Sequence, residues 1–206
     1  MPVRPITKAD LAGKRLLVRA DLNVPIRDGE ITDSSRIDRF AAGMRPLLEQ
    51  GARLVILTHL GRPGGEMNPE LSVDKLRPAL ARALGCKVVF SDVSTGYSAE
   101  RLSLDLGPGE ALLCENVRFN RGEETNDPAL AREFARLGEL YVNDAFSCAH
   151  RAHASTEAIA HELPSYAGPL LMEELAALEA ALDAPQRPAV AIVGGAKVST
   201  KIPVLR

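Results

Sequence analysis

Short apolar runs recur along the chain, and each run gives way to polar or glycine-rich residues. The runs predict five buried strands, at residues 16–18, 53–58, 87–90, 110–114 and 139–143. Between the strands, apolar residues recur at helical spacing, which predicts helices over residues 37–48, 73–84 and 130–137. Strands that alternate with helices are typical of a parallel sheet with helices on both faces. The pattern therefore predicts a Rossmann-like, three-layer α/β fold with a doubly wound parallel sheet.

Local signals indicate where the helices begin and end. Ser72 and Asp127 are candidate N-caps, and the proline after Asp127 suits the first position of a helix. Gly85 is expected to close the helix that begins near Ser72. Pro46 lies inside the first helical pattern and is expected to kink or shorten that helix.

A change of pattern near residue 170 predicts a domain boundary. Leucines at helical spacing over residues 171–183 indicate a long helix, and two prolines among polar residues follow it. We expect an amino-terminal domain at 1–170 and an interdomain helix and linker at 171–188. Residues 189–206 then form the first strand and phosphate loop of a second, similar domain. One strand and a helix start cannot bury a core, so this domain is expected to be truncated.

The charge and composition exclude several classes of protein. The 25 lysines and arginines and 27 acidic residues give a net charge of -2, whereas general nucleic-acid or membrane-surface binders carry a basic excess. No apolar run approaches the roughly 20 residues that span a bilayer. Three widely spaced cysteines suit a reducing compartment. Cys114 lies in an apolar strand, where an unreactive core thiol is expected. We expect a cytoplasmic monomer.

Polar side chains collect where the predicted strands end. In a parallel sheet these carboxyl ends share one edge, which is where ligands bind. The residues at this edge are Asp21, Asn23, Arg36, His59, Arg62, Arg118, His150 and Arg151. Guanidinium groups gathered at one edge require a polyanion, and their planar fork suits both phosphate and carboxylate. The carboxylate and the amide would bind a hydroxyl group. The predicted ligand is small and carries a phosphate, a carboxylate and a hydroxyl between them.

A second anion site is predicted after the strand at 189–193. Its glycines and lysines stand at the start of a helix, where backbone N–H groups favour anions. The residues are Gly194, Gly195, Lys197 and Lys201. This is not a Walker A motif, because Ala196 replaces the glycine that should precede the lysine.

Other chemistries lack a supporting pattern. Cys148, His150 and His153 lie close together, but no Cys-x-x-Cys or His-Glu-x-x-His motif accompanies them, so we expect no metal site. Ser147 and Ser155 lack the Gly-x-Ser-x-Gly setting of a nucleophile. A dehydrogenase would need Gly-x-Gly-x-x-Gly after the first strand, and this chain has Asp-Leu-Asn-Val-Pro there.

Seven motifs, taken together and in order, resemble the phosphoglycerate kinase family. They are Arg19-Ala-Asp-Leu-Asn-Val-Pro25, Ser35-Arg36-Ile37, Thr58-His-Leu-Gly-Arg-Pro63, Glu115-Asn-Val-Arg-Phe119, Asn143-Asp-Ala-Phe146, Ala149-His-Arg-Ala-His153 and Gly194-Gly-Ala-Lys-Val-Ser199. The resemblance covers the amino-terminal domain of that family and the first motif of the carboxy-terminal one. Ala20 and Thr200 depart from residues common in the family, without removing a functional group.

The resemblance implies a glycolytic enzyme that transfers a phosphoryl group reversibly between ATP and 3-phosphoglycerate, giving ADP and 1,3-bisphosphoglycerate. It implies that seven of the residues at the strand edge, Asp21, Asn23, Arg36, His59, Arg62, Arg118 and Arg151, bind 3-phosphoglycerate, with His150 close by. It also implies that Arg36 and Lys197 face the phosphoryl group, and that Gly194, Gly195, Lys197 and Lys201 bind the nucleotide. Mg²⁺ would travel with ATP or ADP, and its protein carboxylate would lie in the missing half. The chain alone is expected to bind 3-phosphoglycerate without turnover. The alternative is a non-catalytic α/β module that binds small anions.

Overall fold

The computed structural model describes residues 3–182 of the chain. The chain divides into a compact unit, Met1–Glu174, and a second unit, Leu175–Arg206. The predicted linker at 183–188 and the predicted strand and phosphate loop at 189–206 lie outside the described residues. The domain boundaries expected from the sequence stay a prediction.

The first unit is built on a six-stranded sheet in which every neighbouring pair of strands is parallel. Its strands lie in the order β5-β6-β4-β1-β7-β8. Their bounds are β1 Arg15–Ala20, β4 Arg53–Leu57, β5 Val88–Ser91, β6 Ala111–Cys114, β7 Leu140–Asp144 and β8 Ser165–Ala167. The parallel sheet confirms the predicted fold class. The short edge strand β8 was not predicted, because three residues carry little periodicity.

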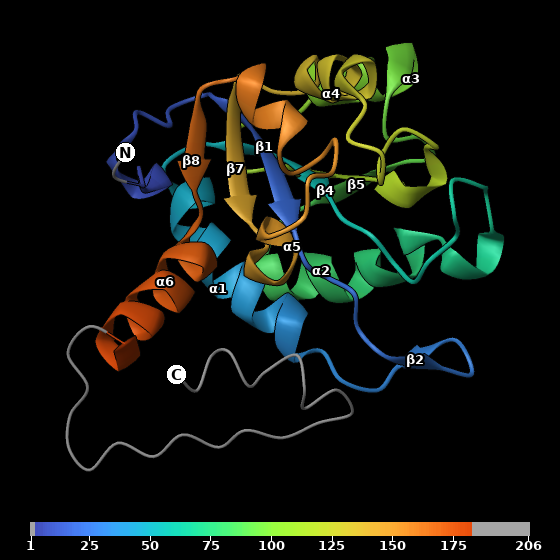
Figure 1. Cartoon of the computed structure of the whole chain (residues 1–206), viewed down its shortest axis with the longest axis horizontal. Coiled ribbons are helices and arrows are strands. Elements are labelled where there is room, and N and C mark those ends of the chain that lie inside the picture. Colours follow the sequence, from blue (N-terminus) through green and yellow to red (C-terminus); the bar gives the residue numbers. More distant parts are fainter. Residues whose placement is uncertain (1–2, 183–206) are drawn as a thin grey trace. The chain divides into compact units, whose positions relative to one another are not determined.

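Helices cover both faces of the sheet (Figure 1). Helices α1 and α2 contribute to one buried core and α3 and α4 to the other. The helices are α1 Ser35–Glu49, α2 Arg77–Leu84, α3 Gly96–Leu104, α4 Pro128–Ala135, the short α5 Phe146–Ala149 and α6 Pro169–Leu182. Among the described residues, no helix has the length and apolar character needed to cross a membrane.

Strand β1 shows how the sequence divides between the two cores. Leu16 and Val18 pack in the core with α1, while Leu17 packs in the core with α4. Successive side chains of a strand point to opposite faces, and a parallel sheet buries both. Arg19 therefore lies on the same face as Leu17, and its side chain is completely buried.

The helix ends follow the local signals in most places. Asp127 accepts a hydrogen bond from the N–H of Ala129 and so caps α4. Gly85 closes α2 with a φ of 70°, in the left-handed region that favours glycine. Pro46 does not shorten the first helix, because α1 continues past it to Glu49.

Helix α3 and the hairpin of β2 Ile26–Arg27 and β3 Glu30–Ile31 were also absent from the sequence prediction. Helix α3 fills the connection between β5 and β6. Strands β2 and β3 form an antiparallel hairpin where only a turn was expected. Asp28 and Gly29 at its tip both have positive φ, as a tight hairpin turn requires.

Candidate functional site

The predicted ligand edge is a real pocket. It has a volume of about 210 Å³ and is lined by Asp21, Asn23, Arg36, His59, Gly61, Arg62, Arg118, Ser147, Cys148 and Arg151. Seven of the eight residues predicted for the first anion site are in this set. They come from segments up to 130 residues apart, and the sheet brings these segments together at the carboxyl ends of its strands.

The strand order explains this convergence. Strand β1 lies between β4 and β7, and β6 lies next to β4. Asp21 follows β1, and His59 follows β4. Arg118 lies in the 3₁₀ helix after β6, and Arg151 follows the short α5 that comes after β7. Arg36 reaches the pocket from the first turn of α1, as predicted.

Arg118 is the most firmly held of the four pocket arginines. Its side chain is 4% exposed, and one terminal nitrogen donates to the carbonyl of Gly61 at 2.8 Å. Its Nε lies 3.4 Å from a carboxylate oxygen of Glu124. Burial lowers the pKa of Arg118, although an arginine with a neighbouring carboxylate stays charged at neutral pH. Arg118 therefore gives the pocket a charge in a fixed position.

The two hydrogen-bonding side chains that follow β1 are also held in place. Asp21 accepts hydrogen bonds from Arg36 and from the hydroxyl of Ser147. Burial opposes ionisation of Asp21, but the hydrogen bond from Ser147, the charge of Arg36 and the N–H of Asn23 together outweigh it and lower the pKa of the carboxyl. The side-chain oxygen of Asn23 accepts the N–H of Gly61 at 3.1 Å, and within residues 3–182 its amide NH₂ has no protein partner, so it can donate to a ligand.

His59 adds a hydrogen-bonding group to the pocket rather than a charge. It is 5% exposed, and burial together with the charges of Arg19 and Arg118 lowers its pKa to about 3. A histidine with so low a pKa is neutral throughout the physiological range.

The structure does not bring His150 into the pocket. His150 caps the C-terminus of α5, is exposed, and is not among the residues that line the pocket. Arg62 lines the pocket but is also exposed. The nucleotide residues predicted from the sequence, Gly194, Gly195, Lys197 and Lys201, lie outside the described residues.

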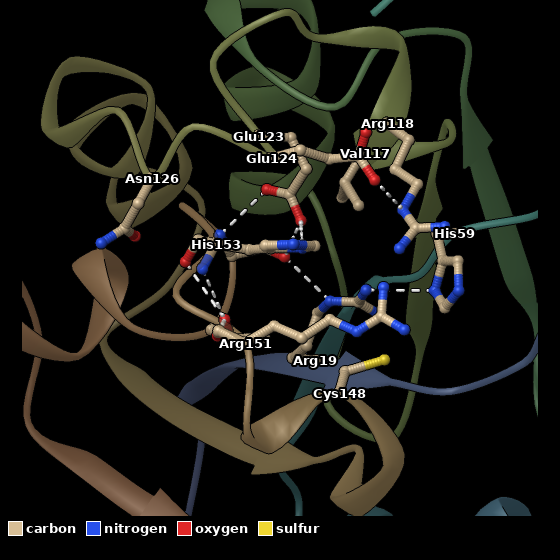
Figure 2. Close-up of polar contacts among 12 residues, drawn as sticks. Arg19, His59, Val117, Arg118, Glu123, Glu124, Asn126, Cys148, Arg151 and His153 are labelled. Carbon is tan, nitrogen blue, oxygen red and sulfur yellow. Dashed lines mark hydrogen bonds and ion pairs between the residues drawn. The ribbon is translucent and has the colours of Figure 1, made fainter. Parts of the chain in front are cut away.

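Sequence reasoning missed a buried polar network behind the pocket, centred on Arg19 (Figure 2). Arg19 contacts His59 and Ser155, and Ser155 in turn bonds to the buried carboxylate of Glu123. His153 lies against the same carboxylate, with its Nδ1 3.7 Å from an oxygen. The alternation of β1 was the available signal, because it places Arg19 on the buried face of Leu17.

No metal-binding cluster is found in the part of the chain that the structure describes. Within residues 3–182, no group of three or more histidine, cysteine or acidic side chains could hold an ion. The three cysteines are unpaired. Cys114 is completely buried, which raises the pKa of its thiol to about 12 and confirms its place in the core.

A second hollow of about 250 Å³ adjoins the pocket and shares Asp21, Arg36 and Ser147 with it. Asp144 at the end of β7 lines this hollow, is 3% exposed, and accepts the N–H groups of Leu170 and Leu171. Its second oxygen is buried without a hydrogen-bond partner within the described range. Burial outweighs the two hydrogen bonds and raises the pKa of Asp144 to about 7.

The fold and the pocket together define an α/β domain that presents a basic site at the carboxyl ends of its strands. Comparison with known proteins then gives the family. The family model described as Phosphoglycerate kinase matches residues 6–206, so the chain belongs to the phosphoglycerate kinase family.

Relatives and solved structures agree with this assignment. The phosphoglycerate kinase of Maricaulis maris is 54% identical over 204 residues, which cover 99% of this chain and 51% of that protein. The phosphoglycerate kinase of Ruegeria pomeroyi is 56% identical over 196 residues, which cover 95% of this chain and 49% of that protein. The structure of phosphoglycerate kinase from Coxiella burnetii superposes with a TM-score of 0.86 at 42% identity. The match covers 99% of this chain and 51% of that one. The chain thus spans about half the length of the relatives it matches.

Proposed function

We propose that this chain is the 3-phosphoglycerate-binding part of a phosphoglycerate kinase, which transfers a phosphoryl group reversibly between ATP and 3-phosphoglycerate. The observation that carries the proposal is the convergence of four arginines on one pocket that also holds a carboxylate, an amide and a neutral imidazole. Membership in the family supports the reaction class.

The chemistry of the pocket matches this substrate. 3-Phosphoglycerate carries a phosphate at one end, a carboxylate at the other and a hydroxyl between them. Arg36, Arg62, Arg118 and Arg151 supply charge-assisted donors for both anionic ends. Asp21 and Asn23 supply an acceptor and a donor for the hydroxyl.

The reaction needs positioning and charge neutralisation more than a protein nucleophile, because the carboxylate of the substrate itself attacks the phosphoryl group. In this proposal Arg36 stabilises the charge on the moving phosphoryl group. Lys197 and Lys201, with Gly194 and Gly195, meet the nucleotide phosphates. Mg²⁺ travels with ATP or ADP and neutralises phosphate charge, and the described residues add no metal-binding cluster of their own.

Calorimetric titration of the 206-residue chain tests the substrate proposal. We expect heat with 3-phosphoglycerate that fades as salt is raised, because the contacts are largely ionic. We expect little heat with ATP and no turnover, since the relatives are about twice as long as this chain. Tight ATP binding, or turnover by the 206-residue chain, would contradict this division of roles.

The alternative is a non-catalytic module that binds small anions at the same arginines. Selectivity separates the two functions. A general anion module would bind inorganic phosphate or 2-phosphoglycerate as tightly as 3-phosphoglycerate, whereas a substrate site built around the hydroxyl should prefer 3-phosphoglycerate. We further propose that the protein acts as a monomer in the cytoplasm, which suits its unpaired cysteines.

A further inference from the structure

Arg19 is a charged residue at a completely buried position in strand β1, which is unusual. It is the largest of the completely buried side chains, and arginine is almost never fully buried unless it is paired. It lies in β1 directly behind the pocket, yet it is not among the residues that line the pocket. Its charge must therefore be satisfied by protein groups, and the role of Arg19 can be inferred from these hydrogen-bond partners.

Every nitrogen of the Arg19 guanidinium has an acceptor. Nε donates to the hydroxyl of Ser155 at 2.8 Å, and one terminal nitrogen donates to the carbonyl of Ala20 at 2.5 Å. The other terminal nitrogen lies 3.1 Å from Nδ1 of His59 (Figure 2). The planar guanidinium thus has three hydrogen-bond contacts, and those to Ser155 and Ala20 fix the direction of the third nitrogen toward His59.

Ser155 connects this guanidinium to a buried counter-charge. Its hydroxyl donates to one oxygen of Glu123 at 2.5 Å, and its N–H donates to the other at 3.0 Å. Tyr141 donates its own hydroxyl to the carbonyl of Ser155 at 2.8 Å. Glu123 is completely buried, so Arg19 and Glu123 balance each other across one hydroxyl group.

In the hydrogen bond between Arg19 and His59, only Arg19 can be the donor. An arginine has five donors and no acceptor, so Nδ1 of His59 must accept and cannot carry a proton. A neutral imidazole then carries its proton on Nε2. Within residues 3–182, no protein group is hydrogen-bonded to Nε2, and His59 lines the pocket. The N–H is therefore left for the ligand.

The charges around His59 disfavour its protonated form from several sides. Arg19 faces it from β1, Arg118 from the segment after β6 and Arg151 from the segment after β7, and among the described residues only Asp21 acts in the opposite direction. Arg36 and Arg62 line the same pocket. A doubly protonated imidazole would have to share this space with five positive charges.

We propose that Arg19 is a positioning residue that holds His59 as the neutral Nε2–H tautomer, so that the imidazole donates one directed hydrogen bond to an anionic oxygen of the ligand. The ligand part of this inference rests on the proposed function, whereas the tautomer part does not. Ser155 and Glu123 orient the guanidinium and compensate its charge. His59 thereby selects an oxygen by direction, while the arginines attract the anion by charge.

Nitrogen-15 NMR of the ligand-free chain tests the tautomer directly. The chain has 4 histidines, and loss of one signal in His59→Gln identifies the ring. We expect an acceptor-type Nδ1 and a protonated Nε2 that do not change between pH 5.5 and pH 8, the range in which an ordinary histidine titrates. A protonated Nδ1, or a ring that titrates near its ordinary pKa, would overturn the proposal.

The variant Arg19→Met removes the donor while keeping bulk. Because Arg19→Met leaves the buried carboxylate of Glu123 without its counter-charge, the double variant Arg19→Met/Glu123→Gln is measured beside it. In either variant we expect His59 to show a mixture of tautomers and to titrate. Arg15→Met is the matched control, since Arg15 lies on the same strand and the same face at the opposite end. It should keep the wild-type His59 signals. Wild-type His59 signals in both Arg19 variants would overturn the proposal.

Titration with 3-phosphoglycerate separates this inference from the proposed function. We expect the Arg19 variants to bind about tenfold more weakly than Arg15→Met at the same pH, the cost of one charge-assisted hydrogen bond. Comparison at equal pH cancels the titration of the ligand itself. If the wild-type chain binds no 3-phosphoglycerate, the proposed function fails while the tautomer result still stands. Wild-type affinity in variants whose tautomer has changed would overturn the role of His59 as donor.

Discussion

Arg36, in the first turn of α1, is ion-paired with Asp21, the residue directly after β1. The Asp21 side chain is 14% exposed and that of Arg36 is 50% exposed, so the carboxylate is the fixed member of the pair. The hydroxyl of Ser147 donates to the same carboxylate oxygen. Asp21 thus orients Arg36 in the ligand-free pocket, and removal of either residue should weaken ligand binding for a different reason.

Replacement of Arg36 by alanine should weaken binding of 3-phosphoglycerate by about tenfold or more, because one charge-assisted donor to the anion is lost. Arg36→Lys should restore binding only in part, since an ammonium cannot reproduce the planar fork. Arg45→Ala removes an exposed arginine from the same helix outside the pocket and serves as the control. Isothermal titration at fixed salt measures all three. Equal affinities for Arg36→Ala and Arg45→Ala would remove Arg36 from the binding site.

Replacement of Asp21 by alanine should chiefly weaken binding, because it frees Arg36 and removes the acceptor proposed for the hydroxyl of the ligand. If Asp21 only stabilises a turn, the change would instead lower the free energy of unfolding by about 1 kcal/mol and leave affinity unchanged. Thermal unfolding with and without 3-phosphoglycerate separates the two results. Asp33→Ala is the matched control, since Asp33 accepts the N–H of Ser35 at 2.8 Å and lies outside the pocket.

His59 should make the fold sensitive to acid. Its pKa is about 3 in the folded protein and about 6.5 in the unfolded chain, so only the unfolded chain gains this proton between those values. The free energy of unfolding therefore falls as pH decreases below 6.5, by on the order of 1–2 kcal/mol at pH 5. Urea unfolding at pH 7 and pH 5 should show a smaller loss in His59→Gln than in the wild type. The same loss in both proteins would mean that His59 is charged in the folded state.

Asp144 should produce the opposite dependence on pH. Its pKa is about 7 in the folded protein against an ordinary value of 3.8, so between these values the folded protein keeps a proton that the unfolded chain releases. Its contribution to stability therefore declines as pH rises through this range and levels off above pH 7. Asp144→Asn keeps an acceptor for the N–H of Leu170 and should lose this dependence, while Asp105→Asn on an exposed residue should retain it. Denaturant unfolding from pH 5 to pH 8 measures the difference.

Much of the pocket lining could be predicted because its signals are local. Asp21, His59 and Arg118 each lie within four residues of the end of an apolar strand, and the carboxyl ends of parallel strands meet at one edge. Arg36 could be placed in the first turn of a helix from the pattern that follows it. His150 follows a strand in the same way, yet it is exposed at the end of α5, because the direction of a side chain on a short helix is not a local property.

The sequence by itself determined the class of fold, most of the residues that line the pocket and the family that the motifs resemble. Those features depend on periodicity and on residue types that are neighbours in the chain. The tertiary structure alone decided the strand order, with β1 between β4 and β7, and it decided that Arg19 is buried behind His59. A buried charge is stable only where partner groups can hydrogen-bond to it. The partners of Arg19, Ser155 and His59, are 136 and 40 residues away in the chain. Such contacts exist only once the sheet has assembled.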